Sequence, residues 1–234
     1  MIKTTTTSKF SRLFYIFPLF VMLLAVSNPS YAESKQVTPD VSVIDARMTE
    51  NEAFNGLNPK CPEELRKKQK IVQVKYYSYD NRIHEGQVVV DGELEEDIKT
   101  VFKQALNEHF VIYSVIPISD KHFRKNNSWD DDLSMEANNT SAFNYRMITG
   151  STTRLSKHAQ GRAIDINPFQ NPYIKGDTVL PTGSTYDPMV AGTLTADSPI
   201  VKTFLRLGWD WGGNWTSYKD YQHFEKPRSN ATKK

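Results

Sequence analysis

The stretch LSKHAQGRAIDINP, residues 155–168, is the part of the sequence that best defines the expected fold. Its second half, residues 163–167, alternates small or polar residues with isoleucine, which is the period of a β-strand. This period places Asp165 and Asn167 on one face of the strand, while the two isoleucines are buried on the other face. We therefore expect a strand that packs on the core and presents a carboxylate on its opposite face.

The same stretch holds two side chains of the kind that bind metals. Gly161 permits a tight turn between His158 and the strand, so the imidazole and the Asp165 carboxylate can converge on one point. Both groups are good zinc ligands, and a further histidine, His223, follows within the segment DYQHFE. Three protein ligands leave a fourth position for water, as in catalytic zinc sites. Asp220, three residues before the last histidine, could face that water without being a ligand.

Spacing alone leaves a structural interpretation open, in which His158 is a core histidine and Asp165 a capping or turn carboxylate. Other signatures of hydrolytic or nucleotide chemistry are absent from the sequence. It has no G-x-S-x-G, S-x-x-K or H-E-x-x-H motif, and neither a P-loop nor G-x-G-x-x-G. Any hydrolytic chemistry must therefore come from the histidine and aspartate residues.

Outward from this stretch, the hydrophobic pattern predicts an α+β fold. Residues 93–110 carry one apolar stripe of helical period. Residues 198–208 predict a second helix, with a serine N-cap, proline at the first position and a glycine stop. Short strands are expected at residues 71–77, 87–90 and 111–116. We expect a single compact domain with a small antiparallel sheet and packed helices.

Two segments are expected as long loops, residues 119–142 and 170–197. The first contains three consecutive aspartates, residues 130–132, which fit a solvated loop better than a cation site.

The N-terminal segment has the pattern of a secretory signal peptide. A basic start precedes an uncharged apolar run over residues 13–26, and Ser30-Tyr31-Ala32 forms a small-residue cleavage site. The alternative is a retained membrane anchor, but the run is shorter than the roughly 20 residues that a spanning helix needs. We expect a signal peptide over residues 1–32 and hence a secreted or periplasmic protein without a stable membrane anchor.

The rest of the chain divides into three parts. Residues 33–61 are expected as a linker or loosely ordered arm, residues 62–227 as the functional domain and residues 228–234 as a basic tail. Cys61 is the single cysteine, so the chain cannot form an internal disulfide. Beyond residue 32, 26 lysines and arginines face 27 acidic residues, and this balance gives no reason to expect nucleic acid as a partner. We expect a monomer.

Two motifs together resemble a known family. The pattern S-x-H-x-x-G-x-A-x-D, followed by D-x-x-H at residues 220–223, resembles the signature of the zinc D-alanyl-D-alanine carboxypeptidase family, which includes L-alanyl-D-glutamate endopeptidases. The first pattern is matched by Ser156, His158, Gly161, Ala163 and Asp165. Three further stretches resemble the endopeptidase branch: residues 143–146, 165–168 and 208–213. The resemblance spans roughly residues 85–227.

The resemblance implies a Hedgehog/DD-peptidase-like fold and a role for each matched residue. It implies Zn²⁺ held by His158, Asp165 and His223, with Asp220 as the catalytic acid and base. Many exopeptidase members have Glu at the position of Asp220. Arg146 corresponds to the arginine that polarises the scissile carbonyl, and its alternative is a surface ion pair. Ser156 would lie near the substrate, and a plain turn serine is an equal alternative.

The implied function is a secreted zinc peptidase that cleaves peptidoglycan stem peptides by metal-activated water. Either the D-alanyl-D-alanine carboxypeptidase or the L-alanyl-D-glutamate endopeptidase reaction fits the motifs. The first alternative is a non-catalytic zinc-containing cell-wall binding module of the same fold. The second is an unrelated secreted structural protein. Trp209, Trp211 and Trp215 are expected in the core and the cleft wall rather than as glycan-stacking platforms.

Overall fold

The computed structural model describes residues 42–148 and 151–228. The predicted signal peptide, residues 1–32, lies outside these ranges, as do residues 229–234 of the predicted tail. No helix within the described ranges is long and apolar enough to span a membrane.

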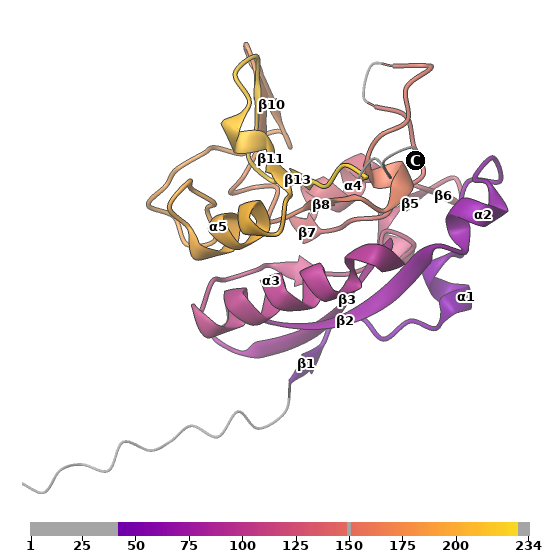
Figure 1. Cartoon of the computed structure of the whole chain (residues 1–234), viewed down its shortest axis with the longest axis horizontal. Helices are drawn as coiled ribbons and strands as arrows, with labels where there is room; N and C mark the ends of the chain where they lie inside the picture. Colours follow the sequence, from indigo (N-terminus) through magenta and orange to yellow (C-terminus); the bar gives the residue numbers. More distant parts are fainter. Residues whose placement is uncertain (1–41, 149–150, 229–234) are drawn as a thin grey trace, which may run out of the picture. The chain divides into compact units, whose positions relative to one another are not determined.

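A long hairpin and one helix form the N-terminal part of the fold (Figure 1). β2 (Gln69–Tyr77) pairs antiparallel with β3 (Ile83–Asp91), and β1 (Val43–Ile44) adds a parallel strand to the other side of β3. β2 alternates buried and exposed residues from Val72 to Tyr76, so one face of the hairpin lies on the core. α3 (Glu95–Asn107) packs along β2, within the range predicted from its apolar stripe.

Two three-stranded sheets form the C-terminal part. One has the order β11-β13-β8, with β11 at Asp210–Trp211, β13 at His223–Glu225 and β8 at Ala163–Asp165. The other has the order β10-β9-β12, with β10 at Thr178–Leu180, β9 at Tyr173–Lys175 and β12 at Lys219–Asp220. α5 (Pro199–Arg206) follows the hairpin of β9 and β10, and proline occupies its first position as predicted. The long loop expected at residues 170–197 therefore contains the β9–β10 hairpin.

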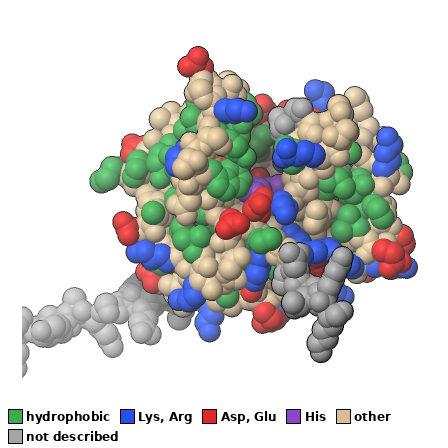
Figure 2. All heavy atoms as spheres, turned by 45° about the horizontal axis from the view of Figure 1, so that its top comes forward, with side chains coloured by type: hydrophobic (Ala, Val, Ile, Leu, Met, Phe, Trp, Pro, Cys, Tyr) green, Lys and Arg blue, Asp and Glu red, His purple; other side chains and the backbone are tan. Residues whose placement is uncertain are grey.

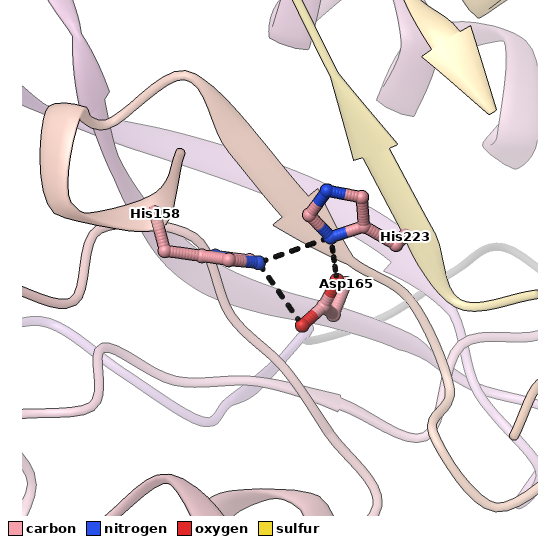
Figure 3. A group of neighbouring side chains, drawn as sticks. All are labelled: His158, Asp165 and His223. Carbon is pink, nitrogen blue, oxygen red and sulfur yellow. Dashed lines mark hydrogen bonds and ion pairs between the residues drawn. The ribbon is translucent and has the colours of Figure 1, made fainter. Parts of the chain in front are cut away.

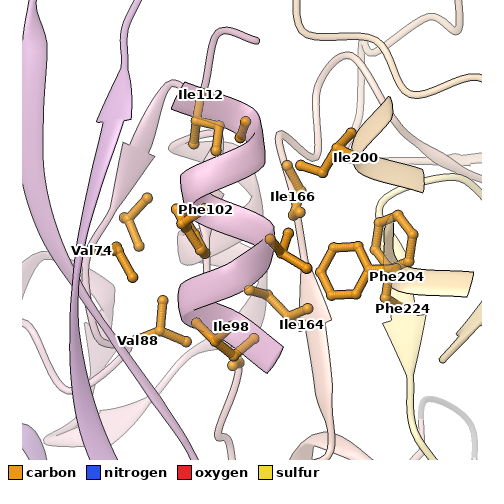
Figure 4. Close-up of a cluster of buried hydrophobic side chains, with 14 of the residues drawn as sticks. Val74, Val88, Ile98, Phe102, Ile112, Ile164, Ile166, Ile200, Phe204 and Phe224 are labelled. Atoms are coloured by element: carbon orange, nitrogen blue, oxygen red, sulfur yellow. The ribbon is translucent and has the colours of Figure 1, made fainter. Parts of the chain in front are cut away.

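The apolar core joins α3 to the sheet that contains β8 (Figure 4). Ile164 and Ile166 are fully buried in this core, and Phe204 of α5 stacks on Phe224 of β13 with 4.0 Å between the ring centroids. Because neighbouring residues of a strand point to opposite faces, Asp165 lies on the face of β8 away from these isoleucines. Burial of the isoleucine side thus fixes the direction of the carboxylate.

Further expectations differ from the structure in detail. The segment expected as a loop at residues 119–142 contains regular elements: 3-10 helix η2 (Lys121–Phe123), β5 (Arg124–Lys125), β6 (Ser128–Trp129), α4 (Asp131–Glu136) and β7 (Asn139–Thr140). These elements are short and mostly polar, so they have no apolar period, and side-chain caps and turn residues define them instead. The strand expected over residues 111–116 is reduced to β4 (Ser114–Val115), which pairs with β7.

The expected linker also contains ordered structure from Val43 onward. β1 and α1 (Glu50–Ala53) lie in it, and a capping box between Thr49 and Glu52 begins the helix. Ala53 and Phe54 are buried in a second apolar cluster with Phe143. α2 (Glu63–Arg66) follows directly. The predicted α+β class, with small sheets and a few helices in one domain, is confirmed.

Candidate metal centre

The structure brings His158, Asp165 and His223 together into one cluster, which we call the His–Asp–His cluster (Figure 3). The Nε2 atom of His158 lies 3.2 Å from Nδ1 of His223 and 3.2 Å from Oδ2 of Asp165. Nδ1 of His223 lies 2.9 Å from Oδ1 of Asp165. All three residues are buried, with 3 to 7% of their surface exposed. One ligand atom of each residue therefore faces a common point.

Strand register and one glycine produce this convergence. His223 of β13 lies directly opposite Asp165 of β8, so both side chains leave the sheet on the same face. His158 begins a 3-10 helix, η3 (His158–Gln160), which Gly161 ends in the left-handed conformation with φ of 67°. A Cβ atom on Gly161 would lie 1.9 Å from the side-chain oxygen of Gln69. Only glycine therefore allows the turn that aims His158 at the strand.

A backbone carbonyl fixes which nitrogen of His158 faces the cluster. Nδ1 lies 2.6 Å from the carbonyl oxygen of Ala142, which can only accept a hydrogen bond. Nδ1 therefore carries the proton and donates it, and Nε2 presents its lone pair to the cluster. This arrangement is the usual one for a metal-binding histidine, whose second nitrogen is held by a neighbouring acceptor.

A carboxylate orients His223 in the same way. Nε2 of His223 lies 3.3 Å from Oε2 of Glu225, two residues along β13, and Nδ1 is the nitrogen that faces Asp165. The two histidines thus offer different nitrogens, Nε2 of His158 and Nδ1 of His223.

The electrostatics of the cluster favour a bound cation. Burial alone would lower the pKa of His223, but the hydrogen bonds to Asp165 and Glu225 outweigh burial and raise that pKa to about 10. Burial alone would raise the pKa of Asp165, but the charges and hydrogen bonds of His158 and His223 outweigh it and hold that pKa well below its usual range. The proton that Nδ1 of His223 carries toward Asp165 therefore lies where a cation could bind instead. Two imidazoles and a carboxylate are the nitrogen and oxygen ligands that zinc prefers, so this donor set fits Zn²⁺.

Asp220 lies in the neighbouring sheet, at the end of β12 and opposite Tyr173. Its Oδ1 atom is buried and has no hydrogen-bond partner in the described structure. Burial raises its pKa to about 6, within the range suited to an acid and base near neutral pH. Gly212 packs against its backbone, where a Cβ atom would lie 2.4 Å from the Asp220 carbonyl oxygen. Asp220 is not among the three clustered ligands.

A comparison with protein families now links this geometry to a known group. A family model described as D-alanyl-D-alanine carboxypeptidase matches residues 149–226. The resemblance to this carboxypeptidase family is confirmed. The matched segment contains all three residues of the cluster and Asp220, whereas Arg146 precedes it by three positions. No curated protein and no solved structure matches the chain.

The resemblance implies that Arg146 polarises the scissile carbonyl. Arg146 lies in a short antiparallel pairing of residues 144–148 with residues 154–158, which includes His158 of the cluster. Ser156 donates its backbone N–H to the Arg146 carbonyl at 3.1 Å, and Asn144 donates to the His158 carbonyl at 3.1 Å. The Arg146 guanidinium pairs with Asp131, with Nη2 and Oδ2 2.7 Å apart, and its Nε is buried without a partner among residues 42–148 and 151–228. The hydroxyl of Ser156 accepts a hydrogen bond from the His158 backbone N–H at 3.2 Å. That contact is the one expected of a turn serine.

Two of the three tryptophans lie in the core, as the sequence predicts. Trp209 and Trp211 are buried, and their indole N–H groups donate to Asp97 and to the Tyr221 carbonyl, each at 2.8 Å. Trp215 is half-buried, and its ring centroid lies 5.5 Å from that of His223. In Figure 2, a histidine side chain is visible at the bottom of a hollow, with acidic and basic side chains beside it.

Three contributions to the site were not predicted from the sequence. Glu225 carries a signal, because residues two apart on a strand share a face and Glu225 follows His223 at that spacing. The Ala142 carbonyl and the Asp131 carboxylate carry none. The first contacts His158 and the second contacts Arg146, and both contacts arise from the tertiary fold.

Proposed function

We propose that the chain is an exported zinc-dependent peptidase that cleaves the stem peptides of peptidoglycan. The observation that carries this proposal is the buried His–Asp–His cluster with an unpaired carboxylate oxygen of Asp220 nearby, inside the segment that matches the carboxypeptidase family. A structural pair of histidine and aspartate would not require the second carboxylate that Asp220 supplies. Among the residues that the structure describes, the cluster also has no fourth protein ligand of the kind that closes a structural zinc site.

Each residue contributes a separate function to peptide hydrolysis. Zinc, when bound by His158, Asp165 and His223, would act as a Lewis acid that polarises the peptide carbonyl and acidifies water. Asp220 accepts a proton from the attacking water at its free Oδ1 and delivers it to the leaving amine. The raised pKa of about 6 supports both halves of this cycle, because the carboxylate must first gain and then lose a proton.

Arg146 stabilises the negative charge that develops on the carbonyl oxygen. Its guanidinium keeps its charge at every working pH, and its buried Nε has no acceptor within the described structure. The guanidinium side chain is 26% exposed, and the second N–H of each outer nitrogen can donate to a substrate oxygen in a strong, charge-assisted hydrogen bond. The half-buried ring of Trp215 forms a wall beside His223 and limits access of solvent.

The substrate class and location follow from the expected export of the chain. Peptidoglycan lies outside the cytoplasmic membrane, where a cleaved signal peptide over residues 1–32 would deliver a secreted or periplasmic protein. Either D-alanyl-D-alanine carboxypeptidase or L-alanyl-D-glutamate endopeptidase activity agrees with the site. We propose that the protein acts as a monomer.

Digestion of purified muropeptides tests the function. The zinc-loaded protein is incubated with muropeptides of defined structure, and the products are identified by mass spectrometry. Loss of a terminal D-alanine identifies the carboxypeptidase reaction, and separation of L-alanine from D-glutamate identifies the endopeptidase reaction. Protein that contains zinc and binds muropeptides without cleaving them would instead be a cell-wall binding module. Protein without zinc would contradict both.

A further inference from the structure

The three consecutive aspartates, Asp130 to Asp132, do not act together. Asp130 is the N-cap of α4, where its Oδ1 accepts a hydrogen bond from the Leu133 backbone N–H at 3.1 Å. Asp132 is exposed on the first turn of the helix. Asp131 points to another segment of the chain, the FNYR stretch at residues 143–146. The triplet is therefore neither a solvated loop nor a shared cation site.

Both carboxylate oxygens of Asp131 interact with side chains of residues 143–146. Oδ2 lies 2.7 Å from Nη2 of Arg146, and Oδ1 accepts a hydrogen bond from the side-chain amide of Asn144 at 3.0 Å. The side chains of the ion pair are 26% and 23% exposed, so the pair is more shielded than an ordinary surface pair. The amide of Asn144 therefore fixes the position of the Asp131 carboxylate, and the carboxylate fixes the position of the Arg146 guanidinium.

Strand register places this pair beside the candidate metal centre. Met147 lies opposite Leu155 in an antiparallel bridge, which places Arg146 opposite Ser156. The hydrogen bonds of the same ladder bring Asn144 to His158. Opposite residues of an antiparallel pair share a face, so Arg146 leaves the ladder on the side of Ser156, two residues from the ligand His158. Asp131 thus holds an arginine that lies opposite Ser156, two residues from the ligand His158.

We infer that Asp131 is a positioning residue that orients the Arg146 guanidinium for catalysis. The inference rests on the proposed function. An arginine side chain has many rotamers, and a planar guanidinium stabilises a developing charge only in the correct orientation. Nη2 pairs with Asp131, and Nη1 lies 3.3 Å from the Met147 carbonyl oxygen. Each of these outer nitrogens carries two N–H groups, so each keeps one N–H that a substrate oxygen can accept, and the two contacts fix the direction of both.

The test compares kcat and KM on a muropeptide for Asp131→Asn, Arg146→Lys and the double variant. Asn has nearly the shape of Asp but lacks the charge, so the helix and the contact to Asn144 are disturbed little. We expect Asp131→Asn to lower kcat/KM by about 10- to 100-fold, the range that corresponds to losing a hydrogen bond between charged groups. We also expect the same division between kcat and KM as in Arg146→Lys, and little further loss in the double variant.

Two controls separate positioning from stability. Asp132→Asn changes the neighbouring carboxylate, and wild-type kinetics are expected because Asp132 is exposed and has no ion pair in the described structure. Asp131→Glu keeps the charge, and it should retain more activity than Asp131→Asn. Zinc content and melting temperature are measured for every variant. If Asp131→Asn fails to fold, Asp131→Glu carries the comparison with Arg146→Lys.

Several outcomes would overturn the inference. These are wild-type kinetics for a folded Asp131 variant, losses that multiply in the double variant, or a different division between kcat and KM from that of Arg146→Lys. Wild-type protein that contains zinc but cleaves no muropeptide would instead contradict the proposed function, so the two failures are distinguishable.

Discussion

Replacement of Gly212 by alanine should disable Asp220 without touching a metal ligand. A Cβ atom at this position would lie 2.4 Å from the Asp220 carbonyl oxygen and 2.9 Å from its Cβ. Ordinary van der Waals contact begins at about 3.4 Å, so β12 must move by about 1 Å to admit the methyl group. A displacement of about 1 Å in a catalytic group costs roughly 100-fold in rate. We therefore expect kcat to fall by about two orders of magnitude.

The assay measures kcat on a muropeptide together with zinc content and melting temperature. Zinc content should stay at one ion per chain, because the three atoms nearest to the new methyl group all belong to Asp220, which is not one of the three clustered ligands. Overpacking should lower stability by about 1–3 kcal/mol. Gly92→Ala is the matched control, since its Cβ would meet the flexible Lys70 side chain at 2.9 Å, and full activity is expected. A Gly212→Ala protein with wild-type kcat would refute the claim that the position of Asp220 limits the reaction.

Three further predictions concern the carboxylate and the metal. Asp220→Asn should retain zinc and lower kcat roughly 10²- to 10⁴-fold, and simultaneous loss of zinc would make Asp220 a ligand. Chelation should abolish hydrolysis and lower the melting temperature, because zinc binds only the folded cluster; an unchanged melting temperature would contradict this linkage. Zinc affinity, measured by competition with a chromogenic chelator, should rise between pH 6 and 8, because Zn²⁺ must displace the proton that His223 holds with a pKa raised to about 10. A zinc affinity that does not change with pH would contradict the assignment. In metal-free protein, the proton on His223 stabilises the fold fully below pH 6.5, and this contribution to the free energy of unfolding is lost as the pH rises toward 10.

The parts of the fold with a clear hydrophobic period could be predicted from the sequence. The stripe of α3 and the alternation of Ile164 and Ile166 each reflect burial on one side, and burial is what the pattern records. Spacing alone left a structural interpretation of His158 and Asp165 open, and the resemblance of two motifs to the carboxypeptidase family implied the ligand set. The structure brings those three residues together. The turn at Gly161 was predictable as well, since glycine tolerates its positive φ.

The remaining features depend on contacts that no local pattern records. α4 and the β5–β6 hairpin are too short and polar to show a period, and Asp130 and the turn residues define them instead. Asn167 was expected to continue the strand of Asp165, but it has φ of 47°, and its side chain bonds the Val111 and Gly192 carbonyls. The partners of His158 and Arg146, the Ala142 carbonyl and Asp131, are specified by the tertiary fold.

A zinc-edge anomalous difference map from a crystal of the zinc-loaded protein tests the assignment of the metal centre. We expect one peak per chain, bonded at about 2.0–2.2 Å by Nε2 of His158, Nδ1 of His223 and a carboxylate oxygen of Asp165, with Asp220 outside the bonding distance. No peak at this cluster, or a peak bonded by Asp220 in place of one of these three residues, would contradict it.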